Sequence, residues 1–137
     1  MKMIFVALSL LLGSSAFAGS AYEVRCDVGN KILFADHYLV IGGNHGDFGG
    51  WLRNIRIYDV AQDIHVSEPI LSTQEVLNAG RQTVEILVKS ANATIYAVAP
   101  NLQSRISGSH NGFAAVNVNI GGYQIQSEKL ACSVFLN

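Results

Sequence analysis

The strongest constraint on this chain is its single pair of cysteines, which lie near its two ends. Cys26 and Cys132 are the only cysteines among 137 residues, so only one intramolecular disulfide can form. Each lies on the apolar face of a segment that alternates apolar and polar residues, as half-buried strands do. We therefore predict a bridge that joins the first strand to the last. In the chain-entropy model, a loop of this length stabilises the fold by roughly 4–5 kcal/mol.

The N-terminal segment has the three parts of a secretory signal peptide. Lys2 supplies a positive charge, residues 4–12 form an apolar run, and Ala16 and Ala18 are the small residues expected before a cleavage site. We predict a signal peptide over 1–18, a single β domain over 19–137, and a periplasmic or secreted protein. The apolar run is shorter than the roughly 20 residues that span a bilayer, and no other stretch is long enough, so we expect no membrane span.

Charge gives no indication of a polyanionic partner. The formal net charge is −1, only 14% of residues are charged, and the basic residues form no cluster. Proteins that bind nucleic acid usually present a basic patch or stripe. We therefore expect no nucleic acid partner and leave the partner unknown, with a protein or a small polar ligand as the two candidates.

Period-two alternation predicts an all-β fold. The pattern is clearest over 114–120, and 83–89 with 94–99 reads as a hairpin around 90–92. Seven to nine short strands separated by glycine-rich turns are typical of an antiparallel β-sandwich or a small β-barrel. The predicted disulfide brings the terminal strands side by side in a barrel or face to face in a sandwich, and both remain open.

Three stretches are ambiguous. Residues 64–66 resemble a short strand that ends at 67–69. Ser72 and Glu75 have the spacing of a helix capping box and Gly80 lies where a helix would stop, so at most one short helix is expected near 73–79. Glycine and polar residues over 108–112 indicate a turn.

The glycine-rich stretch 42–51 is the first candidate for a binding site. Loops on a rigid β scaffold often carry function, and here His45, Asp47 and Trp51 could hold a ligand. The alternative is a solvated hairpin tip with Trp51 filling the core. Two ligating side chains do not make a metal site, so no metal or cofactor is predicted.

No catalytic motif is present. The chain lacks a nucleophile elbow, its four histidines are scattered singly, and Ser107–His110 is interpreted as a turn. No catalytic residue is therefore predicted. We expect a non-catalytic binding or interaction module that acts through glycine-rich loops. The alternatives are a structural or envelope-associated subunit with an exposed apolar face and a small hydrolase whose site is assembled in space. The apolar residues expected to face outward are Leu87, Tyr96, Val98 and Phe135.

Overall fold

The structure, a computed structural model, describes residues 21–41, 48–100 and 105–137, and its regular structure there is entirely β-strand. The strands are β1 Tyr22–Val28, β2 Lys31–Ile41, β3 Phe48–Asp59, β4 Ile64–Asn78, β5 Thr83–Ser90, β6 Ala93–Ala99, β7 Gly108–Ile120 and β8 Tyr123–Leu136. Over these same ranges, we find no helix of the length and hydropathy needed to cross a bilayer.

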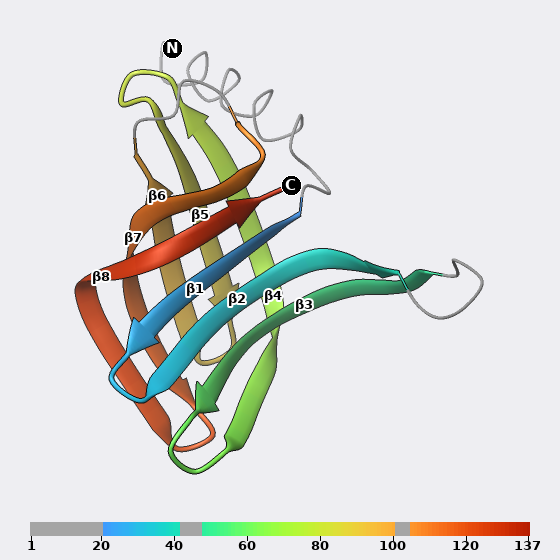
Figure 1. Cartoon of the computed structure of the whole chain (residues 1–137), viewed down its shortest axis with the longest axis vertical. Helices are drawn as coiled ribbons and strands as arrows, with labels where there is room; N and C mark the ends of the chain where they lie inside the picture. Colours follow the sequence, from blue (N-terminus) through green and yellow to red (C-terminus); the bar gives the residue numbers. More distant parts are fainter. Residues whose placement is uncertain (1–20, 42–47, 101–104) are drawn as a thin grey trace.

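The eight strands form one closed antiparallel barrel in chain order (Figure 1). Each strand pairs with the next, and β8 returns to pair with β1. Closure places Cys26 directly opposite Cys132, with their Cα atoms 4.3 Å apart and their sulfur atoms bonded. The predicted disulfide is confirmed. The terminal strands lie side by side, so of the two predicted architectures the barrel is correct.

Alternate residues of each strand fill the barrel interior. On β5, Val84, Ile86 and Val88 are buried, and on β6 the inward positions include Ile95. Burying one such aliphatic side chain stabilises the fold by about 1.5–3 kcal/mol. The largest side chains that are essentially inaccessible include Tyr22, Leu33, Ile55, Ile57, Ile86, Ile95 and Leu136. They come from most of the strands, so the core spans the barrel.

One tight turn shows why glycine is needed there. Gly121 has a φ of +58°, in the left-handed region that favours glycine. A Cβ at this position would lie 2.7 Å from a methyl carbon of Val66 on β4. Any side chain at Gly121 would therefore both strain the backbone and clash with Val66.

The pairing of β4 changes partner half-way along the strand. Residues 64–69 pair with β3, whereas Ile70 and residues 72–78 pair with β5. The change coincides with a bulge at Leu71, whose side chain is 70% exposed. Such bulges bend a strand and increase its twist. As a result, β3 pairs with β4 only over 54–59.

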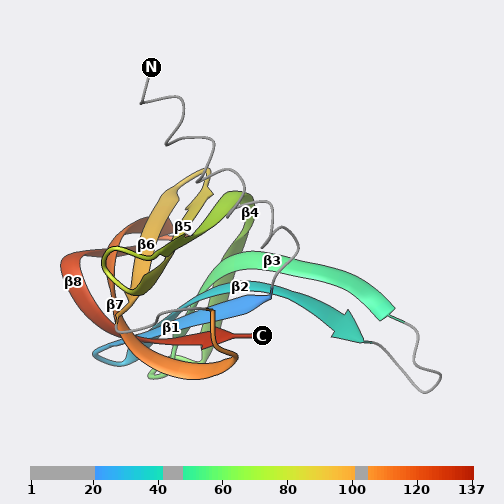
Figure 2. The same ribbon diagram turned by 90° about the horizontal axis from the view of Figure 1, so that it is seen from above.

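The remainder of β3 forms a two-stranded ribbon with the end of β2. We call this ribbon the arm and define it as residues 38–41 of β2 and 48–53 of β3, which pair with each other from Tyr38 opposite Leu52 onward. Both views show the arm reaching out from the barrel body (Figures 1 and 2). Two-stranded ribbons are marginal in water unless they pack on something else.

Three local predictions were wrong. Residues 73–78 continue β4 instead of forming a helix, residues 67–69 do not end the strand, and 108–112 begin β7 instead of making a turn. The capping-box spacing of Ser72 and Glu75 is a local preference worth about 1 kcal/mol. It is overridden by a ladder of backbone hydrogen bonds to β5 and by burial of Glu75 against Arg105.

Candidate functional site

Of the three predicted ligand-binding residues, the structure places one. His45 and Asp47 lie outside the described residues. Trp51 lies on β3 in the arm, opposite Leu39 of β2. Its side chain is 38% exposed, which contradicts the alternative in which it fills the core.

A row of three rings runs from the barrel interior to the arm. The ring of Tyr22 on β1 stacks on that of His37 on β2, with centroids 5.1 Å apart. His37 in turn lies 4.9 Å from the ring of Trp51 on β3. Tyr22 and His37 are buried, so the row anchors a partly exposed tryptophan to the core. The Arg53 guanidinium lies 5.3 Å from the Trp51 ring centre and restrains it further.

The inner end of this row is held by a hydrogen bond across the barrel. The hydroxyl groups of Tyr22 and Thr73 lie 2.6 Å apart, which links β1 to β4. Burial raises the pKa of the Tyr22 hydroxyl to about 12, so it stays neutral throughout the physiological range. The Tyr22 ring therefore has a fixed position. It restrains the His37 ring that stacks on it, and His37 in turn restrains Trp51.

In the part of the chain that the structure describes, two strand edges near these rings have no strand beside them. The half of β3 in the arm pairs there with β2 alone, and the half of β4 from Ile70 to Asn78 pairs with β5 alone. Unpaired backbone N–H and C=O groups along an edge can accept another strand. Several large apolar side chains close to these edges are exposed, namely Leu39, Val40, Trp51 and Leu71.

An ion pair between Arg105 and Glu75 lies on the half of β4 that does not pair with β3. Arg105 donates from Nε to Glu75 on β4 at 2.5 Å and from its other two nitrogens to the carbonyl oxygens of Ala21 and Asn137. Burial raises the pKa of Glu75, which the nearby guanidinium partly offsets. The second oxygen of Glu75 has no hydrogen-bond partner among the described residues. Arg105 thus links β4 to the residue before β1 and the residue after β8 without backbone pairing.

Two carboxyl groups meet on the outer face of β1 and β2. Asp36 is fully buried and receives a 2.5 Å hydrogen bond from Arg56 Nε. Burial and the neighbouring carboxyl group of Asp36 raise the pKa of Glu23 to about 7. The other Asp36 oxygen, Oδ1, has no hydrogen-bond partner in the described part of the chain.

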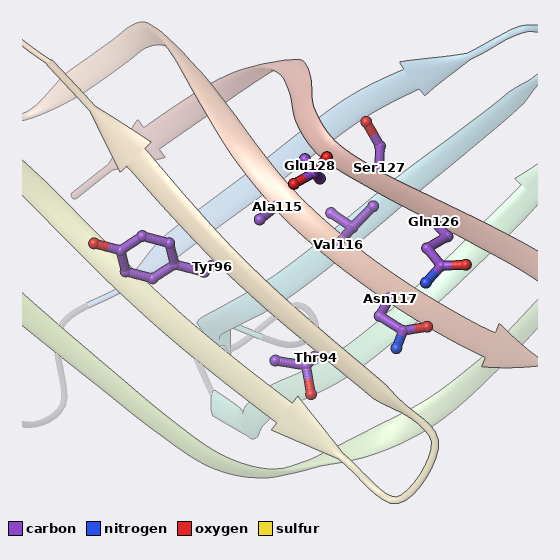
Figure 3. Close-up of a pocket in the computed structure, with 8 residues that line it drawn as sticks. All are labelled: Thr94, Tyr96, Ala115, Val116, Asn117, Gln126, Ser127 and Glu128. Atoms are coloured by element: carbon purple, nitrogen blue, oxygen red, sulfur yellow. The ribbon is translucent and has the colours of Figure 1, made fainter.

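A groove lies on the outer face of β6, β7 and β8 (Figure 3). Its volume is about 750 Å³, within the usual range for small-molecule sites. We call it the β6–β8 groove. It is lined by Thr94, Tyr96, Ala115, Val116, Asn117, Gln126, Ser127 and Glu128. Tyr96 was predicted to face outward, and the structure confirms this. No pattern in the sequence indicated a groove.

His110 contacts the backbone of a neighbouring segment. A ring nitrogen of His110 lies 2.7 Å from the carbonyl oxygen of Ile106. Among the described residues, no three His, Cys, Asp or Glu side chains gather as a metal site would require.

Comparison with known proteins gives no further lead. No protein-family model, curated protein or solved structure matches this chain.

Proposed function

We propose that this protein is an exported, non-catalytic binding module that takes an extended segment of a partner protein onto its arm. Export to the periplasm or the cell exterior is supported by the signal-like segment over 1–18. The Cys26–Cys132 disulfide fits an oxidising compartment.

One observation carries the proposal. Within residues 21–41, 48–100 and 105–137, strand β3 has a hydrogen-bonded neighbour on both sides over 54–59 but on only one side over 48–53. Addition of a strand to such an edge is a recurring mode of peptide recognition, in which main-chain hydrogen bonds provide affinity. The added strand would also give the marginal two-stranded arm the third strand that it needs for stability.

The side chains around the edge can provide an anchor. Trp51 is partly exposed and held by His37, so little conformational freedom remains to be lost on binding. Tryptophan and arginine are the residues most often found at the energetic centre of protein interfaces, and Arg53 lies beside Trp51. Leu39, directly opposite Trp51 on β2, extends the same exposed apolar surface.

The experiment uses the fact that Trp51 is the only tryptophan in the chain. Peptides are selected from a displayed random library against the full mature protein, and each is then titrated while tryptophan emission is recorded. Peptides that pair with the arm should shift this emission. The Trp51→Ala variant, tested with fluorescently labelled peptide, should bind at least about tenfold more weakly.

Two controls separate edge pairing from general stickiness. Val60→Ala removes another exposed apolar side chain, in the turn after β3, and should leave affinity unchanged. Methylating alternate backbone nitrogens of the peptide should abolish binding, because pairing needs those N–H groups. The proposal is wrong if the library gives no binder, if Trp51→Ala binds normally, or if N-methylated peptides bind as well as their parents.

A further inference from the structure

The β6–β8 groove lies beside a bulge in β8. The pairing of β7 with β8 shifts register between Ala114 and Val116, where Ala115 alone faces Glu128 and Lys129, so the extra residue is on β8. The small side chain of Ala115 opposite the bulge leaves space above it, while Tyr96 on β6 and Gln126 on β8 stand at either side (Figure 3). Bulges often serve to re-aim side chains around a functional site.

The wall of the groove is fixed before any ligand arrives. The Tyr96 hydroxyl donates to Glu85 on β5 at 2.5 Å. The other Glu85 oxygen accepts hydrogen bonds from Thr83 at 2.9 Å and Asn78 at 3.2 Å. Burial and the bond to Glu85 raise the pKa of Tyr96 to about 12, so the ring stays neutral and the bond persists. A side chain held in this way loses little entropy on binding.

The opposite side of the groove carries polar groups that are still available. Asn117 and Gln126 are exposed, lie opposite each other across β7 and β8, and neither side chain bonds to any described residue. Each amide has two N–H donors and one carbonyl acceptor. Thr94 on β6 adds a hydroxyl on the same side of the barrel. The lining has a single formal charge, that of Glu128.

We propose that the β6–β8 groove binds a short neutral oligosaccharide. The C–H face of a sugar ring would pack on Tyr96, and its hydroxyl groups would exchange hydrogen bonds with Asn117 and Gln126. Sugar hydroxyls both donate and accept, which matches the amides and the Thr94 hydroxyl. The groove is large enough for a ligand of this size.

The same features disfavour other ligand classes. An anionic ligand would meet Glu128 and no cation in the lining, because Lys129 lies beyond it, over the Phe113 ring. A peptide strand could not add here, because β7 already pairs with β6 over 113–118 and with β8 over 116–120. The groove is also separate from the arm, since β6–β8 and β2–β3 lie on opposite sides of the barrel order.

The test is a panel of neutral oligosaccharides, comprising glucan, mannan, galactan, xylan and chitin fragments, titrated into the full mature protein. Side-chain amide resonances of Asn117 and Gln126 are followed by NMR, and affinity is measured by calorimetry. At least one class should shift both amides. Asn117→Ala should then weaken its binding by about tenfold, the loss expected for one or two hydrogen bonds.

A matched control lies two residues along the same strand. Asn119 is also exposed on β7 but does not line the groove, so Asn119→Ala should bind like the wild type. Both asparagines are on the surface, so neither variant should lose the fold. The proposal is overturned if no oligosaccharide shifts the amides, or if Asn119→Ala weakens binding as much as Asn117→Ala. It is equally overturned if Asn117→Ala binds normally.

Discussion

The two halves of β3 belong to one strand and share the neighbour β2, but they have different surroundings. Over 54–59 the strand also pairs with β4, and Ile55 and Ile57 are completely buried. Over 48–53 that second neighbour is missing, and Trp51 is 38% exposed. The comparison shows that burial here depends on strand pairing more than on residue type. It also locates the surface where the barrel can still accept a strand.

The largest effect should come from removing the disulfide, which lies near neither open edge. Replacing both Cys26 and Cys132 by serine should lower the free energy of unfolding by about 4–5 kcal/mol, because the unfolded chain regains loop entropy. Urea denaturation measures the loss. Since the bridge acts on the whole chain, both halves of β3 should lose hydrogen-exchange protection together. Loss confined to the arm would contradict this.

The next largest effect compares a core substitution in the half of β3 that pairs with β4 with a substitution in the arm. Ile57→Ala in the paired half should cost about 3 kcal/mol, because it leaves a cavity in the core. Val40→Ala in the arm should cost no more than about 0.5 kcal/mol, because that side chain is already exposed. Equal losses in thermal or urea unfolding would show that the arm is packed against something and that its edge is not free.

A substitution of Arg105 tests what stabilises residues 70–78 of β4, which do not pair with β3. Arg105→Met should destabilise the protein by about 2–3 kcal/mol, because Glu75 and two backbone carbonyl groups lose their donors together. Hydrogen exchange should accelerate in β4 near Glu75 but change little in the arm. Glu75→Gln, which keeps an acceptor for Arg105, should cost less. A variant as stable as the wild type would show that the ion pair contributes nothing.

The sequence predicted the disulfide between the terminal strands, but it did not predict the open strand edges. Cys26 and Cys132 fell on apolar faces of terminal strands, and period-two alternation identified the hairpin of β5 and β6. Alternation reports which face of a strand is buried and says nothing about which strand lies beside it. The change of partner in β4 at Leu71 was therefore invisible, and so were the edges that it exposes.

The candidate sites depend on contacts between distant residues, which a single sequence does not show. Trp51 was identified from its position after a glycine-rich stretch, but its contact with His37 follows from the pairing of β2 with β3. The groove lies beside the bulge in β8 opposite Ala115, and alanine there carries no distinctive pattern. Asn117 could be placed on the outer face because its neighbours Val116 and Val118 are apolar.

The smallest predicted effect concerns the carboxyl pair at the junction of the two halves of β3. Asp36 lies opposite Asn54, the first residue of β3 in chain order that pairs with β4. Glu23, opposite Asp36 on β1, has a pKa raised to about 7 by burial and by Asp36. The folded protein thus holds this proton more tightly than the unfolded chain, whose glutamate has a pKa near 4.5. The stabilisation is complete below about pH 4.5 and is lost as the pH rises to about 7.

Glu23→Gln should remove this dependence. Above pH 7 the variant should be more stable than the wild type by about 1 kcal/mol, less than the full pKa shift implies, because solvent reaches a third of the side chain and screens the charge. Below pH 4.5 the two proteins should have equal stability. Urea unfolding from pH 4 to 8 measures the difference, with Glu128→Gln, an exposed change on β8, as the control. If the difference between Glu23→Gln and the wild type does not vary with pH, Glu23 is ionised in the folded protein near neutral pH. The junction would then hold two negative charges beside Arg56, and the half of β3 that does not pair with β4 would begin at a site of repulsion between carboxylates.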